Sequence, residues 1–254
     1  MAEASKASAQ DFVKQQVYHV ALKTELLLTL LFRMLPLYHG PTIKIRIKTG
    51  NTEITVSRDL LCAESSVFTK MFKNGHFKES QEQALDLEEM DDVISTRALE
   101  ALFQWLYRGI IRFNIESPEE HVSAAMELVR FADMYEIDRL EGEMAKYVKE
   151  IIVSADTPFD YYGDDQNTYF LKSDHIISAS NLPCGHAVRR LLAAASVEGY
   201  LRSDEYKFAG LTQEYASFGA DLLQEVQLGL RGLRRSDVSL EDPIRGGRIY
   251  INAR

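Results

Sequence analysis

Isoleucines alternate with basic residues between residues 43 and 48. This period of two predicts a strand with one buried face and one face in water. Gly50-Asn51 follows, a pair that suits a tight turn, and the alternation continues through Ile54 and Val56. The pattern therefore predicts an antiparallel hairpin over residues 42–56.

Two short helices are expected next, because serines stand in front of apolar clusters. Ser57 is a residue type that favours the N-cap of a helix, and Ser65 or Ser66 restarts a helix after it. Asn74-Gly75 supplies the left-handed position that closes many helices. The apolar faces of the two helices contain Leu60, Leu61, Val67, Phe68, Met71 and Phe72.

A short strand at residues 85–87 precedes a second helix-rich stretch. We expect Asp91 or Asp92 to open its first helix and Gly109 to close it. Alternation over residues 111–113 predicts another short strand. The helix before it has one apolar face, made of Leu99, Leu102, Phe103, Leu106 and Tyr107.

The run Ser117-Pro118-Glu119-Glu120 has the composition of a capping box with proline at the first helical position. Asp138 opens the next helix. Further helices are expected at residues 188–195 and, as one longer helix, at residues 211–233. The inner face of the helix after the capping box contains Val122, Ala125, Met126, Val129 and Ala132.

These elements divide the chain of 254 residues into four parts. A helical extension precedes the sheet, and an acidic stretch with proline and glycine separates two structured regions. The parts are an N-terminal helical extension (1–39), a central domain (40–153), an acidic connector (154–180) and a C-terminal helical region with a basic tail (181–254).

The run SRDLLCAESSVFTKMFKNGHFKES at residues 57–80 resembles a BTB/POZ domain of the fungal type. The runs ALEALFQWLYRGIIRF and FADMYEIDRLEGEM are similar to later segments of the same family, and SDHIISASNLPCGHAVRRLLAAASVEGYL resembles the helical tails of some fungal members. The resemblance implies an α+β fold, in which a small mixed sheet is covered by helices, with helical segments on both sides.

For function, the resemblance implies a non-catalytic protein–protein interaction module that acts as an adaptor or scaffold. Its partners would be one or more proteins of unknown identity, and self-association as a homodimer stays open. So does a role as substrate adaptor of a ubiquitin ligase that recruits a cullin scaffold. The residues that we predict to contact a partner are His76, Phe77, Lys78, Arg108, Ile115 and Glu119.

Two departures from the family pattern bear on these roles. Pro41-Thr42 stands where many members carry an Asp at the start of the first strand, and Ser57-Arg58 stands for His-Lys at the end of the second. This argues against the charged pocket of many family homodimers. Ser117 stands where cullin-recruiting members place an apolar anchor, although Glu119 provides the acidic partner.

Charge and motifs argue against several other functions. With 29 Lys and Arg against 38 Asp and Glu, the net charge is −9, which disfavours nucleic-acid binding because phosphate contacts need a clustered positive surface. The tail from Arg231 is locally basic and is interpreted as a solvated, partly frayed segment, and the element Arg245-Gly246-Gly247-Arg248 is too short to indicate RNA binding.

Cys184 and His186 form the one close Cys/His pair, and a zinc site needs three or four ligands. We therefore expect no metal and no cofactor. A cysteine-dependent enzyme built on this pair is one alternative function. With only two cysteines and no signal peptide at the N-terminus, we expect an intracellular protein of the nucleus or the cytoplasm.

A second alternative is association with a membrane surface. Residues 26–32 (LLLTLLF) are apolar, but Lys23, Glu25 and Arg33 limit the run to well below the length of about 20 residues that spans a membrane. We expect a packed amphipathic helix, and such a helix could also lie in a membrane interface. No transmembrane segment is predicted.

Overall fold

The computed structural model describes residues 40–47, 52–73, 75–90, 93–154, 166–231 and 239–250. The predicted N-terminal helix and the Gly50-Asn51 turn lie outside the described residues.

A three-stranded mixed sheet forms one end of the molecule. Strand β1 (Thr42–Ile47) pairs antiparallel with β2 (Thr52–Ser57) and parallel with β3 (Ala84–Leu87), which gives the order β2-β1-β3. The predicted pairing of the first two strands and the predicted short strand at residues 85–87 are confirmed.

The two faces of β1 differ as its alternating sequence requires. Its isoleucines are at most 2% exposed. On the opposite face, Lys44 and Arg46 both form ion pairs with Glu53 of β2, at 2.8 and 2.9 Å. These pairs are solvent-exposed and contribute little stability, so burial of the isoleucines determines which face turns inward.

Two capped helices follow the hairpin, α2 (Arg58–Glu64) and α3 (Ser66–Lys73). The Ser57 hydroxyl accepts the backbone N–H of Leu60 at 3.3 Å, and the Ser65 hydroxyl accepts that of Phe68 at 3.0 Å. Both predicted helix starts are confirmed, because each serine satisfies an amide that the first turn leaves without a partner.

A short helix that we did not predict, α4 (Lys78–Glu82), lies between α3 and β3. Gly75 precedes it with a φ of +69°, the left-handed conformation that was expected after α3. With only five residues, α4 has no apolar periodicity by which its sequence could be recognised.

Helix α5 (Thr96–Arg108) begins later than predicted. The expected start at Asp91 or Asp92 is wrong, because Ser95 is the N-cap and its hydroxyl accepts the backbone N–H of Ala98 at 3.1 Å. Serine and aspartate are both good N-cap residues, and here the serine that directly precedes the helix is the N-cap.

The segment after α5 is not the predicted strand. Gly109 closes the helix with a φ of +65°, as expected, but residues 110–115 have no strand assignment. Phe113 instead packs edge-on against Tyr147, with ring centroids 5.7 Å apart. Alternating apolar residues therefore do not always indicate a strand. They also occur where an extended segment packs every second side chain against neighbouring helices.

Two long helices form the middle of the molecule, α6 (Pro118–Met134) and α7 (Arg139–Val153). The predicted inner face of α6 is buried throughout. Ser117 caps α6 through the backbone N–H of Glu120 at 3.4 Å, and Asp138 stands at the N-cap position of α7. Both helix starts agree with the prediction.

The C-terminal half is mostly helical, and its expected connector region (154–180) contains ordered elements. The division of the chain into four parts stays a prediction. The elements are the 3-10 turn η1 (Gln166–Thr168), helices α8 (Ser173–Ser180), α9 (Ala187–Ala195), α10 (Val197–Arg202), α11 (Ala209–Glu214) and α12 (Ala216–Arg231), and strands β4 (Ser239–Glu241) and β5 (Arg248–Tyr250).

The single helix predicted at residues 211–233 is wrong, because Tyr215 separates α11 from α12. Tyr215 has an extended backbone. Gly219 allows the two helices to approach closely, since a Cβ there would meet the backbone oxygen of Thr212 at 2.9 Å. Apolar periodicity alone does not reveal such a break, because it continues through both helices.

The expectation of a solvated, frayed tail is wrong for the described residues 239–250. Strands β4 and β5 pair antiparallel, and Asp242 and Ile244 in the turn between them are each 5% exposed. Arg245 donates to the Asn167 side chain at 2.8 Å and to backbone carbonyls at the end of α7. Its role is therefore to hold the hairpin against a helix end, where cations are favourable.

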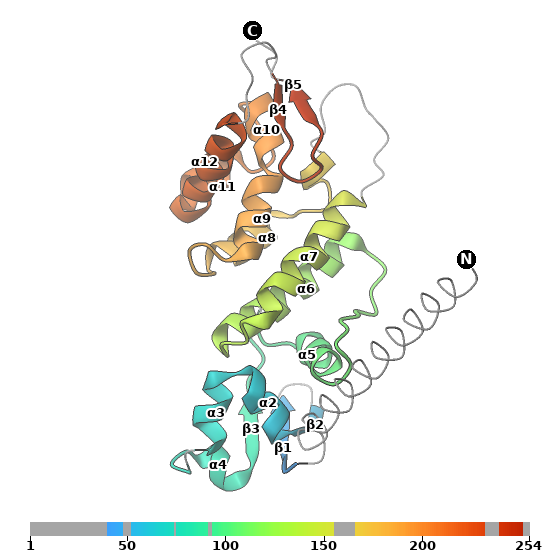
Figure 1. Ribbon diagram of the computed structural model, residues 1–254, viewed down its shortest axis with the longest axis vertical. Helices are drawn as coiled ribbons and strands as arrows, with labels where there is room; N and C mark the ends of the chain where they lie inside the picture. The colour runs from blue at the N-terminus through green and yellow to red at the C-terminus, as the bar shows by residue number, and fades with distance from the viewer. Residues whose placement is uncertain are drawn as a thin grey trace, which may run out of the picture.

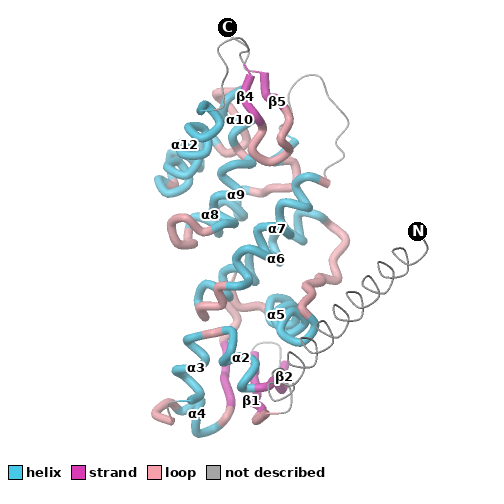
Figure 2. The backbone as a smooth tube through the Cα atoms, in the orientation of Figure 1, coloured by secondary structure: helices cyan, strands magenta, loops and turns pink. Residues whose placement is uncertain are grey.

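The elements are stacked along one long axis (Figures 1 and 2). The sheet with α2–α4 forms one end, α5–α7 lie in the middle, and α8–α12 with the β4–β5 hairpin form the other end. A cluster of buried apolar residues extends through all three parts, from Ile43 in β1 to Ile244 in the turn between β4 and β5.

Candidate interaction surface

The turn between α3 and α4 presents three of the predicted contact residues side by side. His76, Phe77 and Lys78 are all exposed, and the Phe77 ring is 50% exposed. Their backbone is fixed, because the Ser80 hydroxyl donates to the carbonyl of Phe72 at 3.0 Å and the Ser80 N–H donates to the carbonyl of Phe77 at 3.1 Å. An aromatic ring is thus held in solvent by an ordered turn.

Helices α3 and α4, on either side of this turn, carry three lysines and two glutamates, although the whole chain is acidic. Lys70 and Lys73 of α3 are exposed, and Lys78 forms a long, exposed ion pair with Glu82, at 3.5 Å. Exposed pairs of this kind are weak and leave the ammonium group accessible. The surface therefore combines an exposed aromatic ring with accessible cations.

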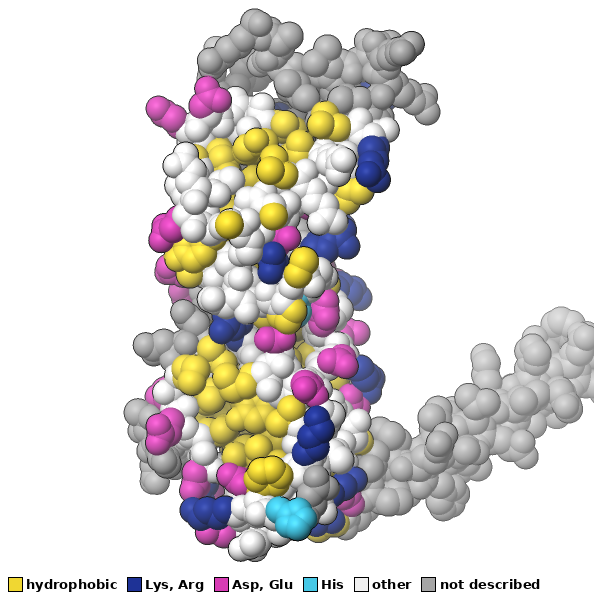
Figure 3. All heavy atoms as spheres, turned by 90° about the vertical axis from the view of Figure 1, so that its left-hand side faces the viewer, with side chains coloured by type: hydrophobic (Ala, Val, Ile, Leu, Met, Phe, Trp, Pro, Cys, Tyr) yellow, Lys and Arg dark blue, Asp and Glu magenta, His cyan; other side chains and the backbone are white. Residues whose placement is uncertain are grey.

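Further exposed apolar side chains belong to neighbouring elements. Met90 (49% exposed) lies between β3 and α5, and Met134 (42% exposed) ends α6. The end of α6 is adjacent to α3, because the hydroxyl of Ser65 donates to the carbonyl of Tyr135. Figure 3 shows hydrophobic side chains gathered over the lower half of this face. Met side chains adapt to partners of different shape.

The other three predicted contact residues lie elsewhere. Arg108 is exposed at the end of α5, whereas Ile115 and Glu119 are half-buried around the start of α6. In Figure 2, that segment lies far from α4 along the long axis. The structure brings residues 76–78 together and separates them from these three, and whether any of the six contacts a partner stays a prediction.

The segment around Ile115 is held by a histidine. His121 is bonded through Nε2 to the Ile115 carbonyl at 2.9 Å and through Nδ1 to the Tyr147 hydroxyl at 2.6 Å. A carbonyl can only accept, so Nε2 donates to Ile115, and Nδ1 shares a hydrogen bond with the tyrosine hydroxyl. Ile115 is therefore fixed in position rather than free to adapt.

The capping box at the start of α6 is only half formed. Ser117 accepts from the backbone of Glu120, as predicted, and its hydroxyl donates to Glu119 at 2.5 Å. The Glu120 carboxylate does not return to the Ser117 backbone, because it binds Lys172 at 2.9 Å and Arg97 at 3.5 Å. The hydrogen bond from Lys172 lowers the pKa of Glu120.

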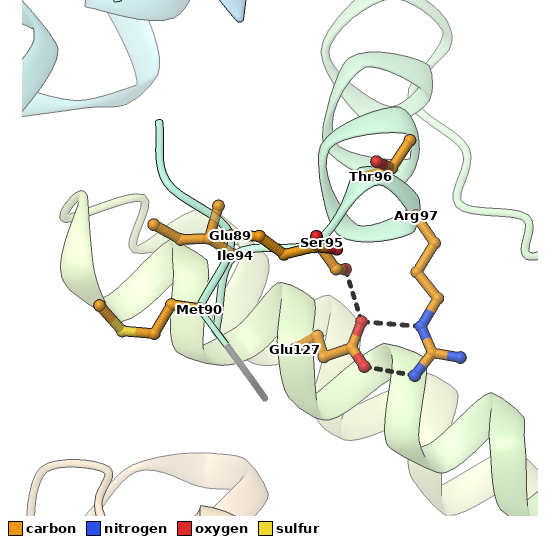
Figure 4. A pocket seen from close by; sticks show the side chains of 7 residues that line it. All are labelled: Glu89, Met90, Ile94, Ser95, Thr96, Arg97 and Glu127. Carbon is orange, nitrogen blue, oxygen red and sulfur yellow. Dashed lines mark hydrogen bonds and ion pairs between the residues drawn. The ribbon is translucent and has the colours of Figure 1, made fainter. Parts of the chain in front are cut away.

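Helix α6 carries a buried carboxylate that we did not predict (Figure 4). Glu127 of α6 is 8% exposed, accepts from the Ser95 hydroxyl at 2.6 Å and from Nε of Arg97 at 2.7 Å, and binds Arg97 through its second oxygen as well. The sequence does indicate such a pair, because Glu127 stands among apolar residues of α6 that are expected to be buried. A buried carboxylate needs a cation close to it.

The same residues border a hollow of about 490 Å³ that is open to solvent. Three of its polar residues are paired with one another: Ser95 and Arg97 both bind Glu127, and the hydrogen bond with Glu127 raises the pKa of Arg97. Ser95 also caps α5. The arrangement ties α5 to α6 and gives the hollow a fixed polar wall. It is lined by Glu89, Met90, Ile94, Ser95, Thr96, Arg97 and Glu127.

Cys184 and His186 lie at the entrance to α9. Cys184 is exposed, whereas His186 is buried and its Nδ1 accepts the backbone N–H of Val188 at 3.2 Å, which makes it the N-cap of the helix. Burial lowers the pKa of His186. This ring nitrogen is used in capping and is unavailable as a base for the thiol.

Within the residues that the structure describes, no cluster of three or more His, Cys, Asp or Glu side chains has the arrangement of a metal site. None of the helices in that part of the chain combines the length and apolar character that a membrane crossing requires.

Comparison with known proteins agrees with the fold. Residues 39–152 match the family model of the BTB/POZ domain. A search of curated proteins gives no match to the chain. The match begins before β1 and ends within α7, so it covers the mixed sheet and the helices α2–α7. The sequence match and the architecture together identify residues 39–152 as a BTB/POZ domain.

Proposed function

We propose that the protein is a non-catalytic adaptor or scaffold that binds a protein partner at the turn between α3 and α4. The observation that carries the proposal is the Phe77 ring, half-exposed on a fixed turn among basic side chains. Aromatic residues that are ordered before binding make efficient contacts, because little side-chain entropy is lost. The lysines favour a partner segment that is acidic.

Quantitative affinity capture tests this proposal. The full chain and its Phe77→Ala variant would be used as baits, with Tyr169→Ala as the matched control, because Tyr169 is an equally exposed aromatic residue (51%) far from α4. We expect a specific partner that is retained by the control and depleted at least about tenfold by Phe77→Ala, as loss of a central interface contact predicts. Equal capture by both variants would refute the proposed site.

Recruitment of a cullin scaffold is a finer form of the same function, and we propose that it is weak or absent. Ser117 occupies the position of the apolar anchor, and its hydroxyl is used within the first turn of α6. Calorimetric titration with a cullin N-terminal domain should give no binding, or weak binding, at micromolar concentration. A sub-micromolar dissociation constant would contradict this, and Ile115 would then be the apolar residue to test first.

A further inference from the structure

The solvent-facing side of α12 carries a regular stripe of uncharged residues, all but one of them apolar. The spacing of its members alternates between four and three residues, the period at which side chains meet a second helix in a coiled coil. Leu223 is 56% and Leu230 is 44% exposed, and the other members are exposed as well. We call this set the α12 stripe; it consists of Ala216, Ala220, Leu223, Gln227 and Leu230.

The acidic groups of α12 point the opposite way. Asp221 is bound by Arg189 of α9, and their side chains are only 7% and 10% exposed. Glu225 is 9% exposed and is bound by Arg190 at 3.1 Å. This helix thus buries both of its carboxylates on the same side as Phe218, Leu222 and Val226. Leucines, at positions 223, 228 and 230, remain on its solvent side, where an ordinary surface helix carries charged residues.

The exposed positions of α12 before Arg231 carry no charge, in a chain whose net charge is −9. Figure 3 shows the corresponding upper half of this face with apolar and uncharged surface and few charged side chains. Two copies of an acidic protein repel each other over most of their surfaces, but this helix face lets them meet without apposing like charges.

We propose that the α12 stripe is a contact between two copies of this chain, with the two helices antiparallel. The stripe has small residues at its N-terminal end and leucines toward its C-terminal end, so antiparallel pairing places Ala216 opposite Leu230 of the second copy. Leu223 then lies next to Leu223 of the second copy, at the two-fold axis. Such a contact is self-complementary, as a two-fold interface requires.

The contact is independent of the partner proposed at α3 and α4, which lie at the other end of the molecule. A variant that disrupts the α12 stripe should therefore leave capture through Phe77 intact. Failure of one proposal does not imply failure of the other, because the two are measured on different variants.

Light-scattering measurement of the mass of the full chain at micromolar concentration tests the proposal. Leu223→Glu should halve the mass of the assembly, because it brings two carboxylates together at the axis. Leu228→Glu is the matched control, because Leu228 is 41% exposed on the same helix but is turned about 140° away from Leu223. The assembly formed by the Leu228→Glu variant should have the same mass as that of the wild type. Circular dichroism checks that both variants are folded.

Cross-linking distinguishes this contact from association through the BTB/POZ domain. In a Cys184→Ser background, which removes the exposed native thiol, Leu223→Cys should give a covalent dimer with a short bismaleimide, and Leu228→Cys should not. A monomeric wild type, an unchanged mass in Leu223→Glu, or equal cross-linking at both positions would overturn the proposal. A further variant tests whether the N-terminal segment covers the stripe. If the protein is a monomer, and deletion of residues 1–36 makes the thiol introduced at position 223 more reactive, the stripe binds the N-terminal segment and not a second copy.

Discussion

Arg189 of α9 binds both carboxylate oxygens of Asp221 on α12, and both side chains are almost completely buried. Arg189 also donates to the carbonyls of Leu182 and Ser217, at 3.0 and 3.2 Å. One guanidinium therefore links α9, α12 and the end of α8, and its charge is compensated only while Asp221 is ionised.

Removing one member of this pair should destabilise the protein strongly. Arg189→Met leaves an unpaired buried carboxylate and should lower the free energy of unfolding by about 3–5 kcal/mol in urea denaturation. The double variant Arg189→Met/Asp221→Leu should recover much of this loss, because no buried charge remains. Lys78→Met, which breaks an exposed ion pair, is the control and should change stability by less than about 1 kcal/mol. Equal effects of Arg189→Met and Lys78→Met would refute this role of the pair.

The two halves of the BTB/POZ core should respond alike to truncation. Phe68 on α3 and Leu102 on α5 are both completely buried, so replacing either by Ala removes packed apolar volume and leaves a cavity. We expect each variant to lose about 2–5 kcal/mol of unfolding free energy. A denaturation midpoint equal to that of the wild type would show that the face concerned is not part of the core.

These two positions also show which features could be predicted from the sequence. Phe68 and Leu102 lie in helices with a clear apolar period, and the hairpin around Ile45 has a strict alternation, so their burial follows from local pattern. The docking of Arg245 could not be predicted, because its partner Asn167 is distant in the sequence. The break at Tyr215 could not be predicted either, because the apolar period continues through α11 and α12.

The candidate surface was predictable for a different reason. An exposed turn after Gly75 can be recognised locally, and residues 76–78 do lie together there. Glu127 was missed because its partner Arg97 is 30 residues away in the chain and on another helix. Glu119 and Ile115 are candidates for a separate reason: Glu119 is the acidic residue of the cullin-recruiting pattern, and Ile115 is the apolar residue nearest to its missing anchor.

Acid should destabilise the contact between α6 and α8 through His175. Its Nδ1 accepts the Lys172 N–H at 3.0 Å and its Nε2 is bonded to the Ser123 hydroxyl at 2.9 Å, so the ring is neutral. Burial, together with the nearby Lys172 and Lys207, lowers its pKa to about 4, whereas Asp174 and Glu120 act in the opposite direction.

The sign of the effect follows from these pKa values. The unfolded histidine, with a pKa near 6.5, binds a proton at pH 5, whereas the folded one does not, so stability falls as the pH drops from about 6.5 toward 4. Between pH 7.5 and 5 the wild type should lose about 2 kcal/mol more than His175→Gln. Urea denaturation at the two pH values measures the difference, and identical losses would contradict this assignment.

The C-terminal hairpin should depend on Arg245. Arg245→Ala leaves Asn167 and the last carbonyls of α7 without their donor, and we expect a loss of about 1–3 kcal/mol. Arg231→Ala, an exposed arginine at the end of α12, is the control and should stay within about 0.5 kcal/mol of the wild type. If Arg245→Ala and Arg231→Ala have equal free energies of unfolding, Arg245 does not hold the hairpin in place.

The proposed role of this chain is to hold a protein partner against the turn between α3 and α4. Photo-cross-linking in cells probes that contact itself, with a benzophenone amino acid placed at Phe77 or, as a control, at Tyr169 in the full chain. We expect a discrete covalent adduct with one protein from position 77 that is absent from position 169. The absence of any adduct at position 77, or the same adducts at both positions, would show that the turn is not the binding site.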